Sequence, residues 1–240
     1  MVAALSAVIA GCWIYLLAGA GLAGHGMTEA AMSPAAWSAG YALLVLVMWW
    51  VMMVGMMLPS AAPMILLFTR VNRRARERGG PSVAPGFFVT GYALAWGGFS
   101  VGAVALQWGL ERSGLLSAMM TVSSGALGGA LLVSAGLYQL SPMKRRCLSH
   151  CRSPLDYLAH RWQSGTRGAL RMGLGHGAYC LGCCWALMGL LFYGGVMNLV
   201  WIAGLALYVL LEKTVPAGHG IGRGLGWVLV AWGVVVIVGP

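Results

Sequence analysis

The stretch YALLVLVMWWVMMVGMMLPSAAPMILLF, residues 41–68, contains no charged side chain. A helix rises about 1.5 Å per residue and the hydrocarbon core of a bilayer is about 30 Å thick, so about 20 apolar residues are enough to cross it. This stretch therefore predicts a transmembrane helix. It is the longest apolar run in the chain, and it decides the fold class.

Composition extends this prediction to the whole chain of 240 residues, which is 60% hydrophobic and 8% charged. Soluble domains carry about 25% charged residues. Six further apolar runs are long enough to be spans: residues 3–23, 86–109, 117–140, 174–194, 196–212 and 220–238. We predict an all-α, polytopic transmembrane helix bundle of about seven spans, forming a single domain over residues 1–240.

The basic residues predict the orientation of the bundle, because lysine and arginine are retained in cytoplasmic loops. With the N-terminus inside, 14 of the 15 lie on the cytoplasmic side, and only Arg112 lies outside. The expected location is the bacterial inner membrane. The net charge of +10 then reflects topology and attraction to anionic lipid, and we expect no nucleic-acid partner.

The largest soluble piece is a basic cytoplasmic loop at about 141–172. Its Leu155, Leu158 and Trp162 have the spacing of a short amphipathic helix lying at the membrane interface, with Arg161 facing the lipid headgroups. We expect this loop to be a docking surface and not a second domain.

A cluster of metal-ligating residue types lies in the fifth predicted span. His176, Cys180, Cys183 and Cys184 share about a quarter of the helix circumference. A single cysteine packs as a small hydrophobic residue, but polar groups inside a bilayer are costly and usually functional. Thiolates with an imidazole suit soft or borderline metals, whereas thiols alone would suit redox chemistry.

The second span carries a methionine stripe on adjacent i, i+4 rows: Met48, Met52, Met53, Met56 and Met57. Such a stripe can also be simple core packing. Pro59 frees the carbonyl of Gly55 beside it, as in helices that line cavities. Counted from their cytoplasmic ends, Met57 and Cys184 both lie roughly 15 Å deep. We therefore expect thioethers and thiols to meet near the midplane.

Thioether ligands narrow the metal to Cu(I), which methionine and thiolate both favour. Accessory ligands are predicted on both sides of the membrane. The outer loop HGMTEAAM offers His25 and Met27, unless it is an ordinary polar loop, and the cytoplasmic CLSHC offers Cys147, His150 and Cys151. Glu212 is expected to orient the His176 imidazole, with Lys213 beside it; the alternative is a simple Glu212–Lys213 pair.

Four motifs occur in a familiar order: MWWVMMVGMMLPSAAP, GLYQLSPMKRRCLSHCRSP, GHGAYCLGCCWALMGLLFYGGVMNL and LEKTVP. The chain resembles, over roughly residues 40–215, a bacterial family described as predicted metal-binding integral membrane proteins, a domain of unknown function. The resemblance implies that the following residues belong to the family pattern: the Met-rich second span, Tyr138, Gln139, Lys144, Cys151, Arg152, Pro154, His176, Cys180, Cys183, Cys184, Asn198, Glu212 and Lys213. The pattern does not include Cys147 or His150.

Two functions follow from these residues. The first is membrane copper handling or transfer, with a cytosolic or periplasmic protein as metal donor or acceptor. The alternative is a membrane oxidoreductase that uses a copper centre or the vicinal thiols of Cys183 and Cys184. The sequence contains no nucleotide motif and no C-x-x-C-H haem-attachment motif, and it leaves catalytic residues, transport direction and oligomeric state open.

Overall fold

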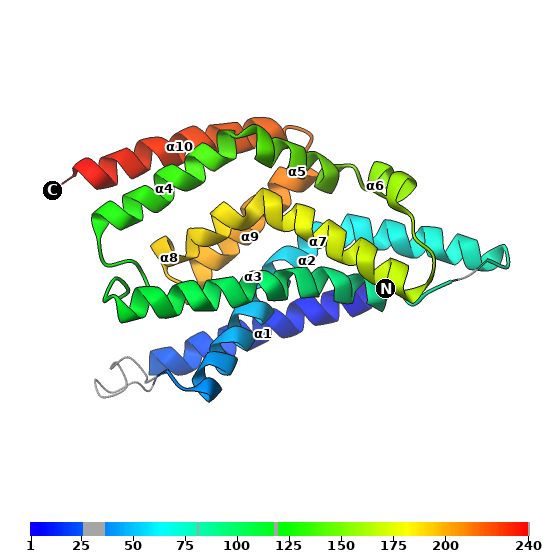
Figure 1. The fold of residues 1–240 in the computed structure, drawn as a ribbon, viewed down its shortest axis with the longest axis horizontal. Coiled ribbons are helices and arrows are strands. Elements are labelled where there is room, and N and C mark those ends of the chain that lie inside the picture. Colours follow the sequence, from blue (N-terminus) through cyan, green and yellow to red (C-terminus); the bar gives the residue numbers. More distant parts are fainter. Residues whose placement is uncertain (26–36, 81, 118–119, 240) are drawn as a thin grey trace.

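The computed structural model describes residues 1–25, 37–80, 82–117 and 120–239, and within these ranges the chain is helical (Figure 1). The only β-type pairing described is an isolated bridge between Leu116 and Val122. The predicted all-α class is confirmed. The helices are α1 (Val2–His25), α2 (Ala39–Glu77), α3 (Gly86–Arg112), α4 (Gly125–Leu140), α5 (Pro142–Arg152), α6 (Pro154–Arg161), α7 (Gly165–Gly189), α8 (Leu191–Gly194), α9 (Leu199–Thr214) and α10 (Gly218–Val238).

Five segments of the described chain are long and apolar enough to cross a membrane: α1, α2, α3, α7 continued through α8, and α10. The other two predicted spans correspond to α4 and α9, which have 16 residues each. At 1.5 Å per residue they reach about 24 Å, less than the hydrocarbon core. The count of seven spans is therefore not confirmed, and the inward N-terminus stays a prediction.

Helix α4 begins later than the predicted span at 117–140, because polar residues at the start of that span form a turn. The Ser117 and Thr121 hydroxyls lie 2.6 Å apart, and Ser124 caps the helix by accepting the N–H of Leu127 at 3.5 Å. Side-chain hydrogen bonds of this kind favour turns and helix starts over helix interiors.

Glycines let the long helices approach closely in two places. Helix α3 packs against α7, where a β-carbon on Gly91 would collide with the Leu170 carbonyl and one on Gly173 with the Phe88 carbonyl. Helices α4 and α10 run side by side along one edge of the bundle (Figure 1). Small residues at such crossings are typical of helix packing in lipid.

The segment at 141–172 contains more helix than predicted: α6 lies where the short amphipathic helix was expected, and α5 precedes it. It contains α5, α6 and the first turns of α7, and α5 packs against α7. Leu148 and Leu158 are buried, whereas Leu155 is 69% exposed. Arg161 lies over the ring of Tyr179 and donates to its hydroxyl at 3.1 Å. This segment therefore packs against α7.

Candidate metal site

Four cysteines from two helices gather on the inward face of α7. Cys180, Cys183 and Cys184 are at most 1% exposed. The Cys183 sulfur lies 3.2 Å from that of Cys184 and 3.9 Å from that of Cys151 on α5. The Cys183 thiol also donates to the Cys180 carbonyl at 3.1 Å. We call Cys151, Cys180, Cys183 and Cys184 the thiol cluster.

Cys151 is the residue that the tertiary structure adds to the cluster. It belongs to the accessory set predicted from CLSHC, and α5 carries it back to α7 across 32 residues of sequence. A hydrogen bond with the Cys180 sulfur raises the pKa of Cys151 well above its usual range. The fold thus brings one sulfur of the CLSHC motif to the cysteines of α7.

A buried lysine lies against the same cluster. The ammonium of Lys213 on α9 donates to the Cys180 sulfur at 2.9 Å and to the Ser60 hydroxyl at 3.1 Å, and the residue is 7% exposed. The Tyr92 hydroxyl of α3 also lies 3.1 Å from the Cys180 sulfur. Lys213 was predicted beside the site, whereas the sequence contains no signal that singles out Ser60 or Tyr92.

The methionine stripe lies one step further into the bundle, and its five members are buried: Met48, Met52, Met53, Met56 and Met57, each at most 8% exposed. Tyr92 and Ser60 both donate to the Met57 carbonyl, at 3.0 and 2.8 Å. The Tyr92 hydroxyl thus contacts both the Met57 carbonyl and the Cys180 sulfur, whereas the predicted common depth of Met57 and Cys184 stays a prediction. Tyr92 and Lys213 bridge the two helices that carry them.

His176 lies one helical turn before Cys180 and is 2% exposed. Aromatic rings surround it: the centroids of Tyr157, Tyr92 and Phe88 lie 5.5, 5.9 and 6.2 Å from its own. Its Nδ1 has no hydrogen-bond partner among the described residues. An unsatisfied buried polar atom costs about 1–3 kcal/mol, and such atoms often mark sites that bind a ligand.

Glu212 contacts neither of the two partners predicted for it, His176 and Lys213. Both of its carboxylate oxygens accept from the Lys144 ammonium, at 2.7 and 2.9 Å, and the two side chains are 0% and 2% exposed. Tyr208 donates to the same carboxylate at 3.1 Å. In the described chain Glu212 therefore neither orients His176 nor pairs with Lys213, because Lys144 from α5 occupies it.

This buried ion pair fixes the position of α5. Arg152, at the other end of α5, donates to the carbonyls of Glu212 and Pro216 at 2.5 and 3.0 Å. The helix that carries Cys151 is thus held against α9 at both of its ends. The family resemblance placed Lys144, Arg152 and Glu212 in one pattern, but their contacts emerge only from the structure.

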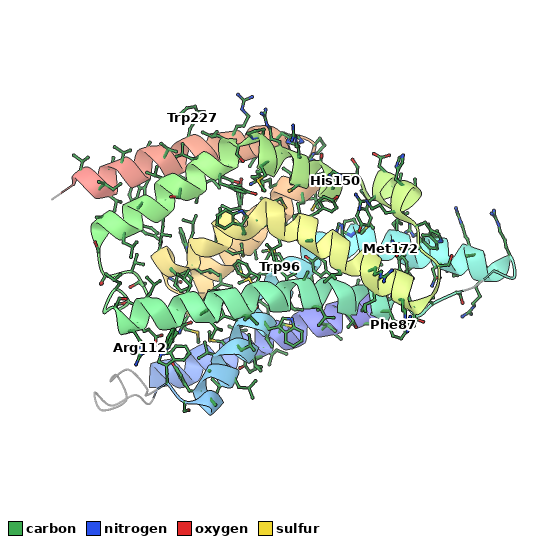
Figure 2. All side chains as sticks on the ribbon, in the orientation of Figure 1. Phe87, Trp96, Arg112, His150, Met172 and Trp227 are labelled. Atoms are coloured by element: carbon green, nitrogen blue, oxygen red, sulfur yellow. The ribbon has the colours of Figure 1, made fainter. Side chains whose placement is uncertain are left out.

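The remaining accessory residues do not join the thiol cluster. His150 is exposed at the edge of the bundle (Figure 2). Its ring stacks on that of Tyr179, with centroids 4.2 Å apart. The Cys147 sulfur packs on Gly182, 2.8 Å from where a β-carbon would stand. The side chain of His25 and all of Met27 lie outside the described residues.

The cluster is not a preformed metal cage. Over the described ranges, no three His, Cys, Asp or Glu side chains are arranged to hold one metal ion. The Cys180 sulfur, for example, contacts the Lys213 ammonium and the Tyr92 hydroxyl and not a shared metal position. A metal ion would have to draw the sulfurs together, and sulfur, imidazole and thioether groups are the donor set of a soft ion.

Comparison with known proteins points to one metal. Residues 46–236 match the family model PpoB2, which is described as a copper chaperone. The matched range includes the whole thiol cluster, the methionine stripe, His176, Lys213 and the Lys144–Glu212 pair. No curated protein and no solved structure matches the chain.

Proposed function

The chain belongs to the PpoB2 copper chaperone family, and on this basis we propose that it binds Cu(I) within a membrane-embedded helix bundle and passes the ion to a partner protein. The observation that carries the proposal is the approach of Cys151 on α5 to Cys183 on α7, with sulfurs 3.9 Å apart. Sulfur ligands from two helices at one buried point suit a soft monovalent ion.

In this proposal the thiol cluster is the loading site. Cys180 and Cys183 are the first pair of ligands, with Cys184 and Cys151 next to them. His176 adds an imidazole whose Nδ1 has no competing partner among the described residues. The aromatic rings around His176 keep water out, so that a bound Cu(I) would be protected from oxidation.

The methionine stripe is the route by which the ion leaves. Met57 is joined to Cys180 through the Tyr92 hydroxyl, which contacts both. From there the buried thioethers continue along α2 for about two and a half turns to Met48. A row of moderate sites lets an ion enter and still leave, whereas one tight site would trap it.

The membrane setting is part of the proposal. Five described helices are long and apolar enough to span, and large apolar side chains cover their outer faces, including Trp227 at 63% exposed on the outside of α10 (Figure 2). Exposed apolar surface of this extent needs lipid or a partner. The distribution of basic residues supports an orientation in the inner membrane with the thiol cluster towards the cytoplasm and Met48 towards the outside.

The test is metal content of the protein purified anaerobically in detergent. Replacing Cys180 and Cys183 by serine should remove most of the bound Cu(I), measured by elemental analysis and by competition with a chromogenic Cu(I) chelator. Cys12→Ser is the matched control, because Cys12 lies on α1 against Gly55 and is not among the residues that contact the clustered sulfurs in the described chain. Equal copper in the double variant and the control, with both folded, would refute the proposal.

A further inference from the structure

We propose that Met172 and His176 on α7 form a second metal site, an entry site that receives a soft monovalent ion from the cytoplasmic side and passes it to the thiol cluster. The inference rests on the proposed function. It adds a ligand, Met172, that belongs neither to the thiol cluster nor to the methionine stripe. The donors of the entry site are one thioether and one imidazole, a pair that suits a soft ion.

Met172 is the first member of a ridge of sulfur and nitrogen donors on α7. Residues four positions apart on a helix are neighbours on its surface. Side chains on a helix lean towards its N-terminus, so the imidazole of His176 lies over the turn that carries Met172. The thioether therefore flanks His176 on the side opposite Cys180. The members of the ridge are each at most 2% exposed: Met172, His176, Cys180, Cys184 and Met188.

One nitrogen of the His176 imidazole has no partner in the part of the chain that the structure describes. This atom, Nδ1, is buried. Two tyrosine rings lie next to the imidazole, but their hydroxyls are engaged elsewhere. Tyr157 donates to the Met172 carbonyl at 2.8 Å, and Tyr92 donates to the Met57 carbonyl at 3.0 Å. A buried polar atom without a partner is costly, and an ion bound at Nδ1 would remove that cost.

The pair lies closer to the surface of the bundle than the thiol cluster does. Helix α6 covers it: Tyr157 packs edge-on against the imidazole, at 68° between the ring planes, and is 4% exposed. The next residue of α6, Asp156, is exposed, so this helix has one buried and one solvent-facing side. Met172 precedes Cys180 by eight residues, about 12 Å along α7. An ion that arrives past α6 therefore reaches Met172 before the thiol cluster.

The chemistry of the two donors sets the order of the sites. Methionine binds Cu(I) and Ag(I) well and Zn(II) poorly. One thioether with one imidazole holds such an ion less tightly than several thiolates do, so the ion moves on from the entry site to the cluster. A series of separate sites lets an ion enter and continue, whereas a single tight site would trap it.

The first experiment separates the entry site from the thiol cluster. In the full chain in detergent, all four cysteines of the cluster are replaced by serine, and Ag(I) binding is measured by calorimetry, because silver is soft, monovalent and stable in air. Met172→Leu and His176→Leu are then added singly to this thiol-free chain. The matched control is Met188→Leu, the same near-isosteric change at a buried methionine beyond the cluster. Thermal melting identifies variants that fail to fold.

We expect Met172→Leu and His176→Leu each to bind one silver ion fewer than the thiol-free chain, because each change removes one of the two donors. Met188→Leu should bind as many as the thiol-free chain. Equal silver binding by Met172→Leu and Met188→Leu would overturn the inference.

The second measurement follows loading of the chain with its cysteines intact. Cu(I) is supplied as a coloured chelator complex, and the loss of colour gives the rate. Met172→Leu should load the same final amount of copper at least about threefold more slowly, and Met188→Leu should load at the parent rate. Loading of Met172→Leu at the parent rate would overturn the inference. If the parent retains no copper, the proposed function fails, and silver binding by the thiol-free chain still decides the entry site.

Discussion

The ion pair between Lys144 and Glu212 should be the most sensitive polar contact in the bundle. It joins α5 to α9, across 68 residues of sequence, and both side chains are almost fully buried. Removing one partner leaves the other charge buried without compensation. Breaking a pair in this way costs about 3–5 kcal/mol, which is a factor of roughly 100 or more in the folding equilibrium.

The predicted perturbation is Glu212→Gln. The carboxamide keeps the size of the side chain and can still accept one bond from Lys144, but the ammonium loses its counter-charge. We expect a loss of about 3 kcal/mol or more in free energy of unfolding, measured by chemical denaturation in detergent. Alkylation of Cys151 should also become faster, because the Glu212 carboxylate holds α5 in place through Lys144.

Two further variants test the contribution of the buried ion pair to stability. Adding Lys144→Met to Glu212→Gln removes both charges and should restore most of the lost stability. Glu77→Gln breaks the exposed pair with Arg73, whose side chains are 63% and 72% exposed, and should cost at most about 1 kcal/mol. If Glu212→Gln costs no more than Glu77→Gln, or if the double variant is no better than the single one, the reasoning fails.

Three other outcomes are expected. The first variant replaces four methionines of the stripe by leucine: Met52, Met53, Met56 and Met57. Copper loading should stay intact, but transfer across proteoliposome membranes should stop. Transfer at the parent rate would mean that the stripe is simple packing. His176→Leu should weaken Cu(I) retention, measured by chelator competition, while lowering the melting temperature little, because its Nδ1 makes no hydrogen bond with the described residues. Gly173→Ala should lower the free energy of unfolding by about 1–3 kcal/mol in the same assay, since the new β-carbon would meet the Phe88 carbonyl. The control is Gly189→Ala, because Gly189 has open space around it. Equal effects of the two substitutions would contradict the close α3–α7 crossing.

Local patterns were enough for much of the fold. The apolar runs predicted the helical class and the approximate positions of α1, α2, α3, α7 and α10, because hydrophobicity and helical period are properties of neighbouring residues. The same holds for the shared face of His176 and the three cysteines on α7. Helix ends were less predictable: α4 starts at Gly125 because Ser124 caps it, and that cap competes with an apolar pattern that continues on both sides.

The amino-acid pattern alone predicted which residue types make up the site: thiols on one helix face and thioethers on another. The partners of these residues follow from the packing of the helices. Glu212 pairs with Lys144 and not with His176 or Lys213, Cys151 joins the thiols, and Lys213 lies against Cys180. These contacts join residues between 32 and 68 positions apart, on helices whose relative rotation follows from glycine-lined crossings and buried charge. A periodic pattern specifies which face of a helix is used, but only packing in three dimensions specifies what that face meets.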